Sequence, residues 1–343
     1  MPIEQAKKPN LPTLEDVAAR AGVSTATVSR SLHAAEQVSR DTRDRVLAAV
    51  RELGYAPNFS AQALAAKRTN TFGAIIPTME NAIFARGLQA FQEQLNEKNI
   101  TLLVASSSYS AELEDEQIRT LVARGADALL LIGHDRSPEI YAFLERRKIP
   151  YVVAWVYDAD MPRLSIGFDN RKAMAALTRR VLDFGHESIA VITAECSEND
   201  RARERLAGVK DALSERGLDL ASLRVIETTY SIGNGASAFS ELMQNGKRPT
   251  AVLCGNDVLA AGALMMARSH GIDVPNDVSI TGFDDIELAQ IVSPALTTVH
   301  VPHREMGRGA ARLLIALRNG EGPGHSIELD ADIRMRETLG PAL

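Results

Sequence analysis

Residues 13–32 read TLEDVAARAGVSTATVSRSL, and their spacing predicts two short helices joined by a tight turn. Thr13 is a suitable N-cap with an acid three positions later, and Gly22 can adopt the left-handed conformation that ends a helix. Ser24 then caps a second helix over 25–32, and Ser39 caps a third that closes at Gly54. Residues 13–55 therefore predict three short helices in the spacing of a helix-turn-helix.

The second of these helices presents small polar groups and one cation on its outer face. Packing of the valines inward leaves Thr25, Ala26, Ser29 and Arg30 pointing outward. In a helix-turn-helix protein, such residues contact base edges in the major groove while nearby hydroxyl groups hold phosphates. A plain three-helix bundle has the same spacing, so the pattern alone leaves both interpretations open.

After residue 69 the sequence changes to apolar runs that alternate with amphipathic, helix-length segments. The runs predict strands at 72–77, 100–105, 127–132, 151–156, 188–193, 223–226, 251–254 and 278–282. The segments between them predict helices that include 82–98, 111–124, 170–184, 203–216 and 257–270. This alternation indicates parallel sheets covered on both faces, and its length suits two doubly wound lobes better than one sheet.

Charge is distributed unevenly along the 343 residues. The net charge of the whole chain is −6, yet residues 1–68 carry +3 and the remainder −9. A basic segment on an acidic body is the asymmetry expected when one end of a protein meets phosphate. No apolar run approaches the length of a membrane span, and residues 1–12 lack the apolar core of a secretory signal. Two cysteines cannot form a disulfide framework, so a reducing cytoplasm is the expected compartment.

The sequence offers no constellation of catalytic residues. It contains no phosphate-binding GxxxxGK[ST] loop, no HExxH zinc motif and no GxSxG nucleophile motif. Gly233-Asn234-Gly235 lacks the later glycine of the dinucleotide fingerprint and is better explained as the start of a helix. Pro302 separates His300 from His303, which argues against a shared helical metal face. We expect no catalytic residues, no metal and no cofactor.

The motifs, taken together, carry a resemblance to a known family. TLEDVAARAGVSTATVSRSL is followed by IIPTMENAIFARGLQAF, GADALLLIG, IPYVVAW, GFDN, LDFGHESIAVI, RERLAGVKDAL, PTAVLCGNDVLAAGAL, VSITGFDD and PALTTVHVPHREMG. In this order they resemble the LacI/GalR family of bacterial transcriptional regulators over almost the whole chain. The stretches PTMENAIFARGLQAF, GFDN and YSIG are similar to its gluconate-repressor branch. The implied fold is an all-α helix-turn-helix headpiece plus an α/β periplasmic-binding-protein-like core of two doubly wound parallel-sheet lobes.

The resemblance also implies which residues meet DNA. Thr25, Ala26 and Arg30 stand where the family reads bases, and a guanidinium such as that of Arg30 can bond O6 and N7 of a guanine together. The implied phosphate contacts are Ser24, Ser29, Ser39 and Asn58, two of which also serve as helix caps. Residues 58–66 match the family's hinge helix, in which Leu64 enters the minor groove while Ala61, Gln62 and Ala65 let two hinges approach.

A small-molecule effector is implied between the two lobes. Matching positions nominate Arg205, Asn256 and Asp284 as a polar clamp that can hold vicinal hydroxyls or a carboxylate. The aromatic residues near the expected cleft, which can stack on a sugar, are Phe84, Trp155 and Tyr230. The chain departs from a pattern found in the family at Trp155, where a cleft carboxylate can stand, and at Val301, where a cleft amide can stand.

The resulting prediction is a cytoplasmic, homodimeric repressor of a pseudo-palindromic DNA operator, controlled by a sugar or sugar acid. The expected domains are a headpiece at 1–57, a hinge at 58–69, an N-terminal lobe at 70–167 and 300–327, and a C-terminal lobe at 168–299 and 328–343. Two alternatives stay open. One is a regulator whose control comes from a protein corepressor, and the other is a sugar-binding protein without DNA function.

Overall fold

The computed structural model describes residues 11–33, 35–56, 68–80, 82–322 and 324–342. The chain divides into two compact units, residues 1–69 and 70–343, and each is described by itself. The predicted hinge residues Asn58, Ala61, Gln62, Leu64 and Ala65 lie outside the described residues.

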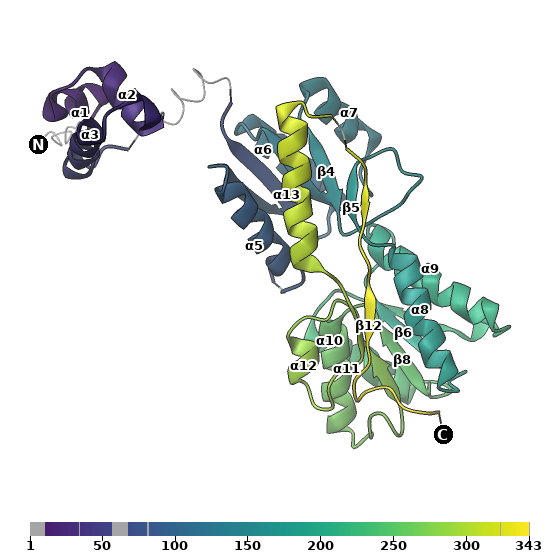
Figure 1. Ribbon diagram of the computed structural model, residues 1–343. Helices are drawn as coiled ribbons and strands as arrows, with labels where there is room; N and C mark the ends of the chain where they lie inside the picture. Colours follow the sequence, from purple (N-terminus) through teal and green to yellow (C-terminus); the bar gives the residue numbers. More distant parts are fainter. Residues whose placement is uncertain (1–10, 34, 57–67, 81, 323, 343) are drawn as a thin grey trace, which may run out of the picture. The chain divides into compact units, whose positions relative to one another are not determined.

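The described residues of the first unit form three α-helices, drawn in purple in Figure 1. They are α1 (Leu14–Ala21), α2 (Thr25–His33) and α3 (Arg40–Leu53), with a 3-10 turn η1 (Ala35–Gln37) between the last two. Thr13 and Asp16 form a complete capping box at the start of α1, and Gly22 ends it with φ 65°. Ser39 caps α3 by accepting a hydrogen bond from Thr42 N. The apolar faces meet in one small core formed by Val17, Ala18, Ala21, Val28, Val46 and Ala49.

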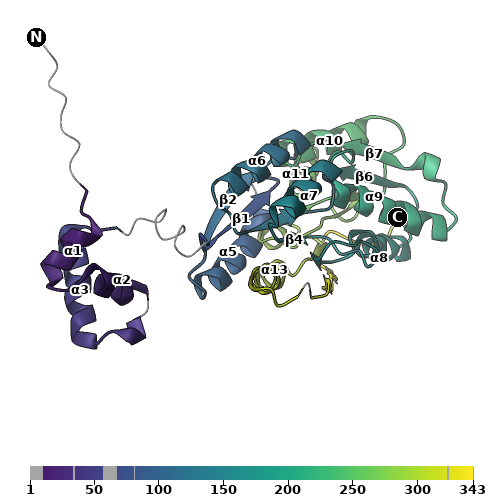
Figure 2. The same cartoon turned by 90° about the horizontal axis from the view of Figure 1, so that it is seen from above.

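The second unit begins with a six-stranded parallel sheet in the order β11-β5-β4-β3-β1-β2. Its strands are β1 (Thr71–Ile76), β2 (Thr101–Ser106), β3 (Ala128–Ile132), β4 (Tyr151–Ala154), β5 (Ser165–Gly167) and β11 (Ile327–Glu328). Successive β1 side chains point to opposite faces, so Phe72, Ala74 and Ile76 enter one core and Ile75 enters another. Figures 1 and 2 show α5 (Ala82–Asn96) beside α13 (His303–Asn319), while α6 (Ala111–Ala123) and α7 (Pro138–Arg147) belong to the core on the other face.

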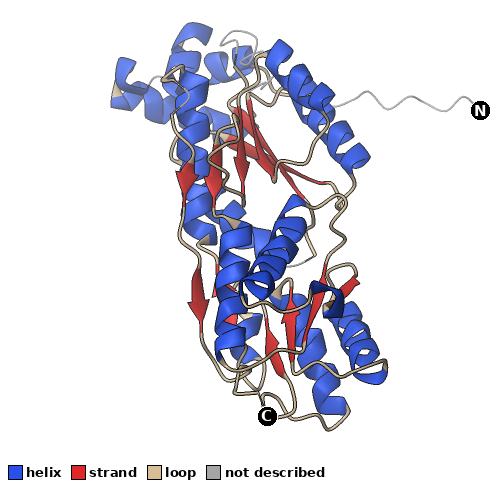
Figure 3. Ribbon diagram, turned by 90° about the vertical axis from the view of Figure 1, so that its right-hand side faces the viewer, coloured by secondary structure: helices blue, strands red, loops and turns tan. Residues whose placement is uncertain are grey.

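A four-stranded parallel sheet of order β7-β6-β8-β9 forms the other lobe of this unit. The strands are β6 (Ile189–Thr193), β7 (Arg224–Glu227), β8 (Ala251–Cys254) and β9 (Ser279–Thr281). Helices α10 (Ile232–Gln244) and α11 (Asp257–Ser269) pack together, as do α8 (Asn170–Asp183) and α9 (Asp200–Glu215). Figure 3 shows the red strands of both sheets between blue helices. Short elements η2 (Leu220–Ser222) and α12 (Leu288–Ile291) complete the lobe.

Three passages of the chain connect the two lobes. One follows β5, a second runs from β10 (Thr298–His300) into α13, and a third runs from β11 to β12 (Asp332–Arg334). Strands β10 and β12 pair antiparallel to each other in a separate two-stranded ladder, and Figure 1 labels β12 on the long yellow C-terminal passage between the lobes.

The fold class and all eight predicted strands are confirmed, with ends that differ by no more than two residues. The strands β5, β10, β11 and β12 were not predicted, because two or three residues are too few to show a hydrophobic period. In the described part of the chain, no helix is both long and apolar enough to cross a bilayer.

Candidate functional site

The outer face of α2 carries the residues predicted to contact bases. Thr25, Ala26 and Arg30 are exposed, whereas Val28 on the opposite face is fully buried. The Arg30 Nε atom donates to the Ala26 carbonyl at 3.3 Å, which directs the guanidinium along the exposed face of the helix. This face is chemically suited to base edges, because it offers a planar cation beside two small side chains.

Three of the four predicted phosphate contacts lie within the described residues. Ser24, Ser29 and Ser39 are all exposed. Ser24 Oγ also accepts a hydrogen bond from Thr27 N at 3.2 Å and therefore stabilises the start of α2. Asn58 lies outside the described residues.

All six predicted effector residues line one pocket in the second unit, which we call the deep pocket. Phe84 and Trp155 come from one lobe, and Arg205, Tyr230, Asn256 and Asp284 come from the other. The carboxyl ends of parallel strands meet at such an edge, which is where α/β folds place their ligands. The pocket holds only about 20 Å³ of free space, because its own side chains nearly fill it.

The Arg205 side chain contacts three neighbours in and around the deep pocket. Its Nη1 donates to Asn170 Oδ1 and its Nη2 to the Tyr230 hydroxyl, both at 2.8 Å. Its guanidinium carbon lies 4.9 Å from the ring centre of Phe283. The Arg205 Nε atom is buried without a hydrogen-bond partner among the described residues.

A second buried donor of the deep pocket also lacks a partner. Asn256 caps α11 by accepting a hydrogen bond from Leu259 N at 2.9 Å, which occupies its oxygen. The Asn256 Nδ2 atom has no partner among the described residues. Two free donors beside the Asp284 carboxyl group match a ligand that offers both hydroxyl donors and oxygen acceptors.

Backbone strain is concentrated in the same pocket. Tyr109, Trp155 and Asp284 line it and have φ values of 62°, 64° and 101°. Positive φ is rare for bulky side chains and costs about 1–3 kcal/mol each, which surrounding structure must offset. Such strain is typical of residues whose side chains are held in position for binding.

Burial shifts the protonation of the acids around the deep pocket. It raises the pKa of Asp284 to about 7, although the charges of Arg205 and Arg201 act against it. Burial and the Asp284 charge together raise the pKa of Asp257 well above its usual value. The Asp257 carboxyl group accepts hydrogen bonds from the Thr298 hydroxyl at 2.5 Å and from Ile286 N at 2.8 Å. A carboxyl group that titrates near neutrality can donate or accept a hydrogen bond toward a ligand.

Trp155 is tied to both lobes through His303, the first residue of α13. Its Nε1 donates to His303 Nδ1 at 3.2 Å, and its ring lies edge-on to Phe84 at 5.3 Å between centres. Because an indole N–H only donates, His303 Nδ1 must accept, so Nε2 carries the proton and donates to the Asp284 carbonyl at 3.2 Å. Burial lowers the pKa of His303 to about 4, which keeps this neutral form.

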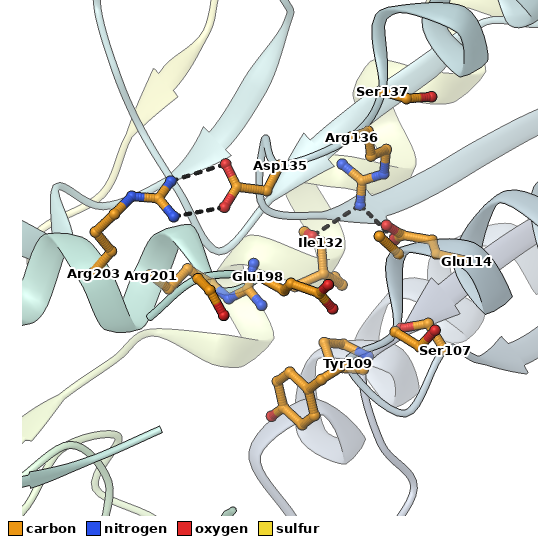
Figure 4. A pocket seen from close by; sticks show the side chains of 14 residues that line it. Ser107, Tyr109, Glu114, Ile132, Asp135, Arg136, Ser137, Glu198, Arg201 and Arg203 are labelled. Atoms are coloured by element: carbon orange, nitrogen blue, oxygen red, sulfur yellow. Dashed lines mark hydrogen bonds and ion pairs between the residues drawn. The ribbon is translucent and has the colours of Figure 1, made fainter. Parts of the chain in front are cut away.

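A second cavity, of about 260 Å³, adjoins the deep pocket and shares Tyr109 and Arg201 with it (Figure 4). Across it, Arg203 of α9 forms a two-pronged ion pair with Asp135, with both N–O distances 2.9 Å. On its other side, the fully buried Arg136 pairs with Glu114 at 2.7 Å. The charges of this cavity are therefore largely paired within the protein, and the Asp135–Arg203 pair joins the lobes.

Sequence reasoning missed several residues of the deep pocket. Phe168 and Asn170 belong to the quoted GFDN stretch, and Tyr109 follows the carboxyl end of β2, where ligand contacts are expected. Asn199 and Arg201 open α9, whose start the sequence placed three residues late. Their positions at strand ends and helix starts were the sequence signal that could have identified them.

Comparison with known proteins agrees with this architecture. Residues 13–58 match the model of bacterial regulatory proteins of the lacI family, and residues 178–339 match a periplasmic binding protein-like domain. The chain is 32% identical over 330 residues to the HTH-type transcriptional repressor PurR of Vibrio parahaemolyticus, covering 95% of this chain and 98% of the relative.

Solved structures resemble the chain over most of its length. The lac repressor dimer bound to operator and the anti-inducer ONPF is similar with a TM-score of 0.84 and 27% identity, covering 96% of this chain and all of that one. The transcriptional regulator CelR in complex with cellobiose is similar with a TM-score of 0.69 and 29% identity, covering 95% and 99%. These likenesses assign a regulator rather than an enzyme. The chain belongs to the LacI family of bacterial DNA-binding transcriptional regulators.

Proposed function

We propose that this regulator is a repressor that acts as a homodimer on a pseudo-palindromic operator and is controlled by a sugar or sugar acid. The observation that carries the effector assignment is the meeting of Arg205, Asn256 and Asp284 in one interlobe pocket. Two buried donors there, Arg205 Nε and Asn256 Nδ2, have no hydrogen-bond partner among the described residues, and a bound ligand would supply acceptors for them. The similar CelR structure holds cellobiose, which supports a sugar.

For DNA binding, we assign base contacts to Thr25, Ala26 and Arg30, whose exposure on α2 supports this role. Ser24, Ser29, Ser39 and Asn58 contact phosphates. Two headpieces read two half-sites, so the symmetry of the operator mirrors that of the dimer. The similar lac repressor structure is a dimer on its operator.

Control by the effector passes through the hinge. Leu64 enters the minor groove at the centre of the operator, and Ala61, Gln62 and Ala65 allow two hinges to approach. The lobes, at 70–167 with 300–327 and at 168–299 with 328–343, change their relation when the effector binds. A coupling of about 1–3 kcal/mol changes operator affinity roughly 5- to 150-fold.

The decisive experiment is footprinting on DNA upstream of the protein's own gene, with and without a panel of sugars, sugar acids and purines. We expect a symmetric protected site whose occupancy changes with one class of compound. Trp155 is the only tryptophan of the chain and lines the deep pocket, so its fluorescence measures binding of the same compounds directly. Arg205→Ala should abolish the fluorescence response and leave operator protection intact.

One observation favours a second candidate function. The deep pocket has little free space because Arg205 bonds to Asn170 and Tyr230 within it. A regulator controlled by a protein corepressor would need no ligand there. No fluorescence or thermal-shift response to any compound at millimolar concentration, with operator protection retained, would favour that candidate.

A further inference from the structure

A third cavity, which we call the outer cavity, opens beside the deep pocket. Its volume is about 670 Å³, within the roughly 300–1,000 Å³ of small-molecule sites. Residues of both lobes line it, among them Ser106 and Ser108 from the end of β2 and Thr228 and Thr229 after β7. The outer cavity is therefore large enough for a ligand group that the deep pocket cannot contain.

The outer cavity and the deep pocket are neighbours with shared walls. Tyr109, Asn199 and Tyr230 line both of them. The rings of Tyr109 and Tyr230 meet edge-on with 5.7 Å between their centres, and the Tyr230 hydroxyl accepts the hydrogen bond from Arg205. Movement of Tyr230 would join the two spaces and expose aromatic surface on which a sugar ring can stack.

The charges around the outer cavity define what it can bind. Its described lining contains the carboxylates of Glu80, Glu195 and Glu198 but no lysine or arginine. Hydroxyl and amide side chains make up most of the rest, including Thr229 and Asn234. An anionic group would meet repulsion here, in contrast to the deep pocket with its Arg205. Carboxylates and hydroxyls are suitable acceptors for sugar hydroxyl groups.

We propose that the effector has two sugar units, one in the deep pocket after Tyr230 has moved to enlarge it, and a second, uncharged unit in the outer cavity. This inference rests on the proposed sugar effector and specifies its size and charge distribution. Any carboxylate of the effector belongs to the unit beside Arg205. The half-buried rings of Tyr109 and Tyr230, on which a sugar can stack, and the many hydroxyl groups of the lining favour a neutral sugar unit.

The test compares matched ligands on the full-length protein by Trp155 fluorescence and calorimetry. The probes are glucose, galactose, mannose and xylose, and the disaccharides cellobiose, maltose, melibiose, mannobiose and xylobiose built from them. We expect one disaccharide to bind at least about tenfold more tightly than its unit sugar. Calorimetry, which a second tryptophan does not disturb, should show that Thr229→Trp, which fills the outer cavity from an exposed position, removes that advantage and leaves monosaccharide affinity unchanged. Thr120→Trp, at an exposed position of α6, is the matched control.

Three kinds of contrary result would overturn different parts of the proposal. Equal binding of monosaccharides and disaccharides, or an advantage that survives in T229W, would overturn the second sugar unit and leave the proposed function standing. Tighter binding of the diamine glucosamine disaccharide than of cellobiose would overturn the uncharged assignment. Absence of binding by every sugar of both sizes would overturn the sugar effector itself, and this inference with it.

Discussion

Asp284 and Asp285 are adjacent aspartates whose protonation the fold shifts in opposite directions. Burial raises the pKa of Asp284 to about 7. By contrast, hydrogen bonds and charge from Arg336 and His300 outweigh burial and lower the pKa of Asp285. Both have positive φ, which asparagine tolerates well, so Asp→Asn changes the ionisable group without a new backbone cost. The two substitutions therefore form a matched pair.

The sign of each effect follows from proton binding in the folded and unfolded states. An aspartate in the unfolded chain ionises near pH 3.8, whereas Asp284 holds its proton until about pH 7. The wild type therefore loses stability as pH rises between these values, and D284N does not. From pH 5 to pH 8 the stability of D284N should rise relative to wild type by roughly 2–3 kcal/mol.

Asp285 should behave in the opposite way. Its carboxylate lies 2.6 Å from Arg336 Nη2 and 2.9 Å from His300 Nδ1. D285N should cost about 1–3 kcal/mol at pH 7, because it leaves a partly buried arginine without its ionic partner. Since the lowered pKa is what stabilises the fold, this cost should disappear only as pH falls through and below about 4.

Urea unfolding followed by Trp155 fluorescence measures the stability of both variants. The Trp155 side chain packs in the same core as Phe283 and Ile286, which flank the two aspartates. The free energy of unfolding of each variant is compared with wild type from pH 4 to pH 8.5. If the D284N difference is the same at pH 5 and pH 8 within about 0.5 kcal/mol, the assignment of a raised pKa to Asp284 is wrong. If D285N and D284N give parallel curves, the opposite environments of the two acids are refuted.

Three further predictions concern DNA contact, lobe contact and helix packing. Arg30→Ala should lose about 1–3 kcal/mol of discrimination between operator and random DNA, measured by anisotropy on both, and equal weakening on both would refute a base contact. Asp135→Asn breaks a half-exposed ion pair with Arg203, so it should lower the free energy of unfolding by less than about 1 kcal/mol, and urea titrations in 1 M NaCl should show a smaller loss. Gly307→Ala should destabilise by about 1–3 kcal/mol in thermal unfolding, because its methyl group would overlap the Gly87 carbonyl where α13 crosses α5; an unchanged Tm would contradict this contact.

Much of the fold was predictable because its signals are local. Helix α1 was predictable from the sequence, because its end signals act within a few residues. They are the capping box of Thr13 and Asp16 and the left-handed Gly22. The strands of the two sheets are buried on both faces and therefore appear as apolar runs, as in Leu129–Ile132 of β3. The resemblance to the family also identified three candidate effector-binding residues that are far apart in sequence and line one pocket, namely Arg205, Asn256 and Asp284.

Other features depend on residues that meet only in the folded chain. The pairing of β10 with β12 joins Val299 to Ile333, and such short strands have no period of their own. Burial keeps His303 neutral, and its hydrogen bonds with Trp155 and Asp284, which lie on separate elements of the fold, fix which ring nitrogen carries the proton.

The sequence alone determined the helix-turn-helix, the alternation of strands and helices, and the kinds of side chain available for DNA and effector. Only the tertiary structure decided that Tyr109 lines both the deep pocket and the outer cavity. It also decided that Asp284 titrates near neutrality while the pKa of Asp285 is lowered. The ion pair of Asp135 with Arg203 between the lobes likewise exists only in the folded chain. The physical reason is that free volume, dielectric environment and charge pairing depend on which distant groups surround a side chain. Caps and hydrophobic periods, in contrast, depend on neighbours along the chain.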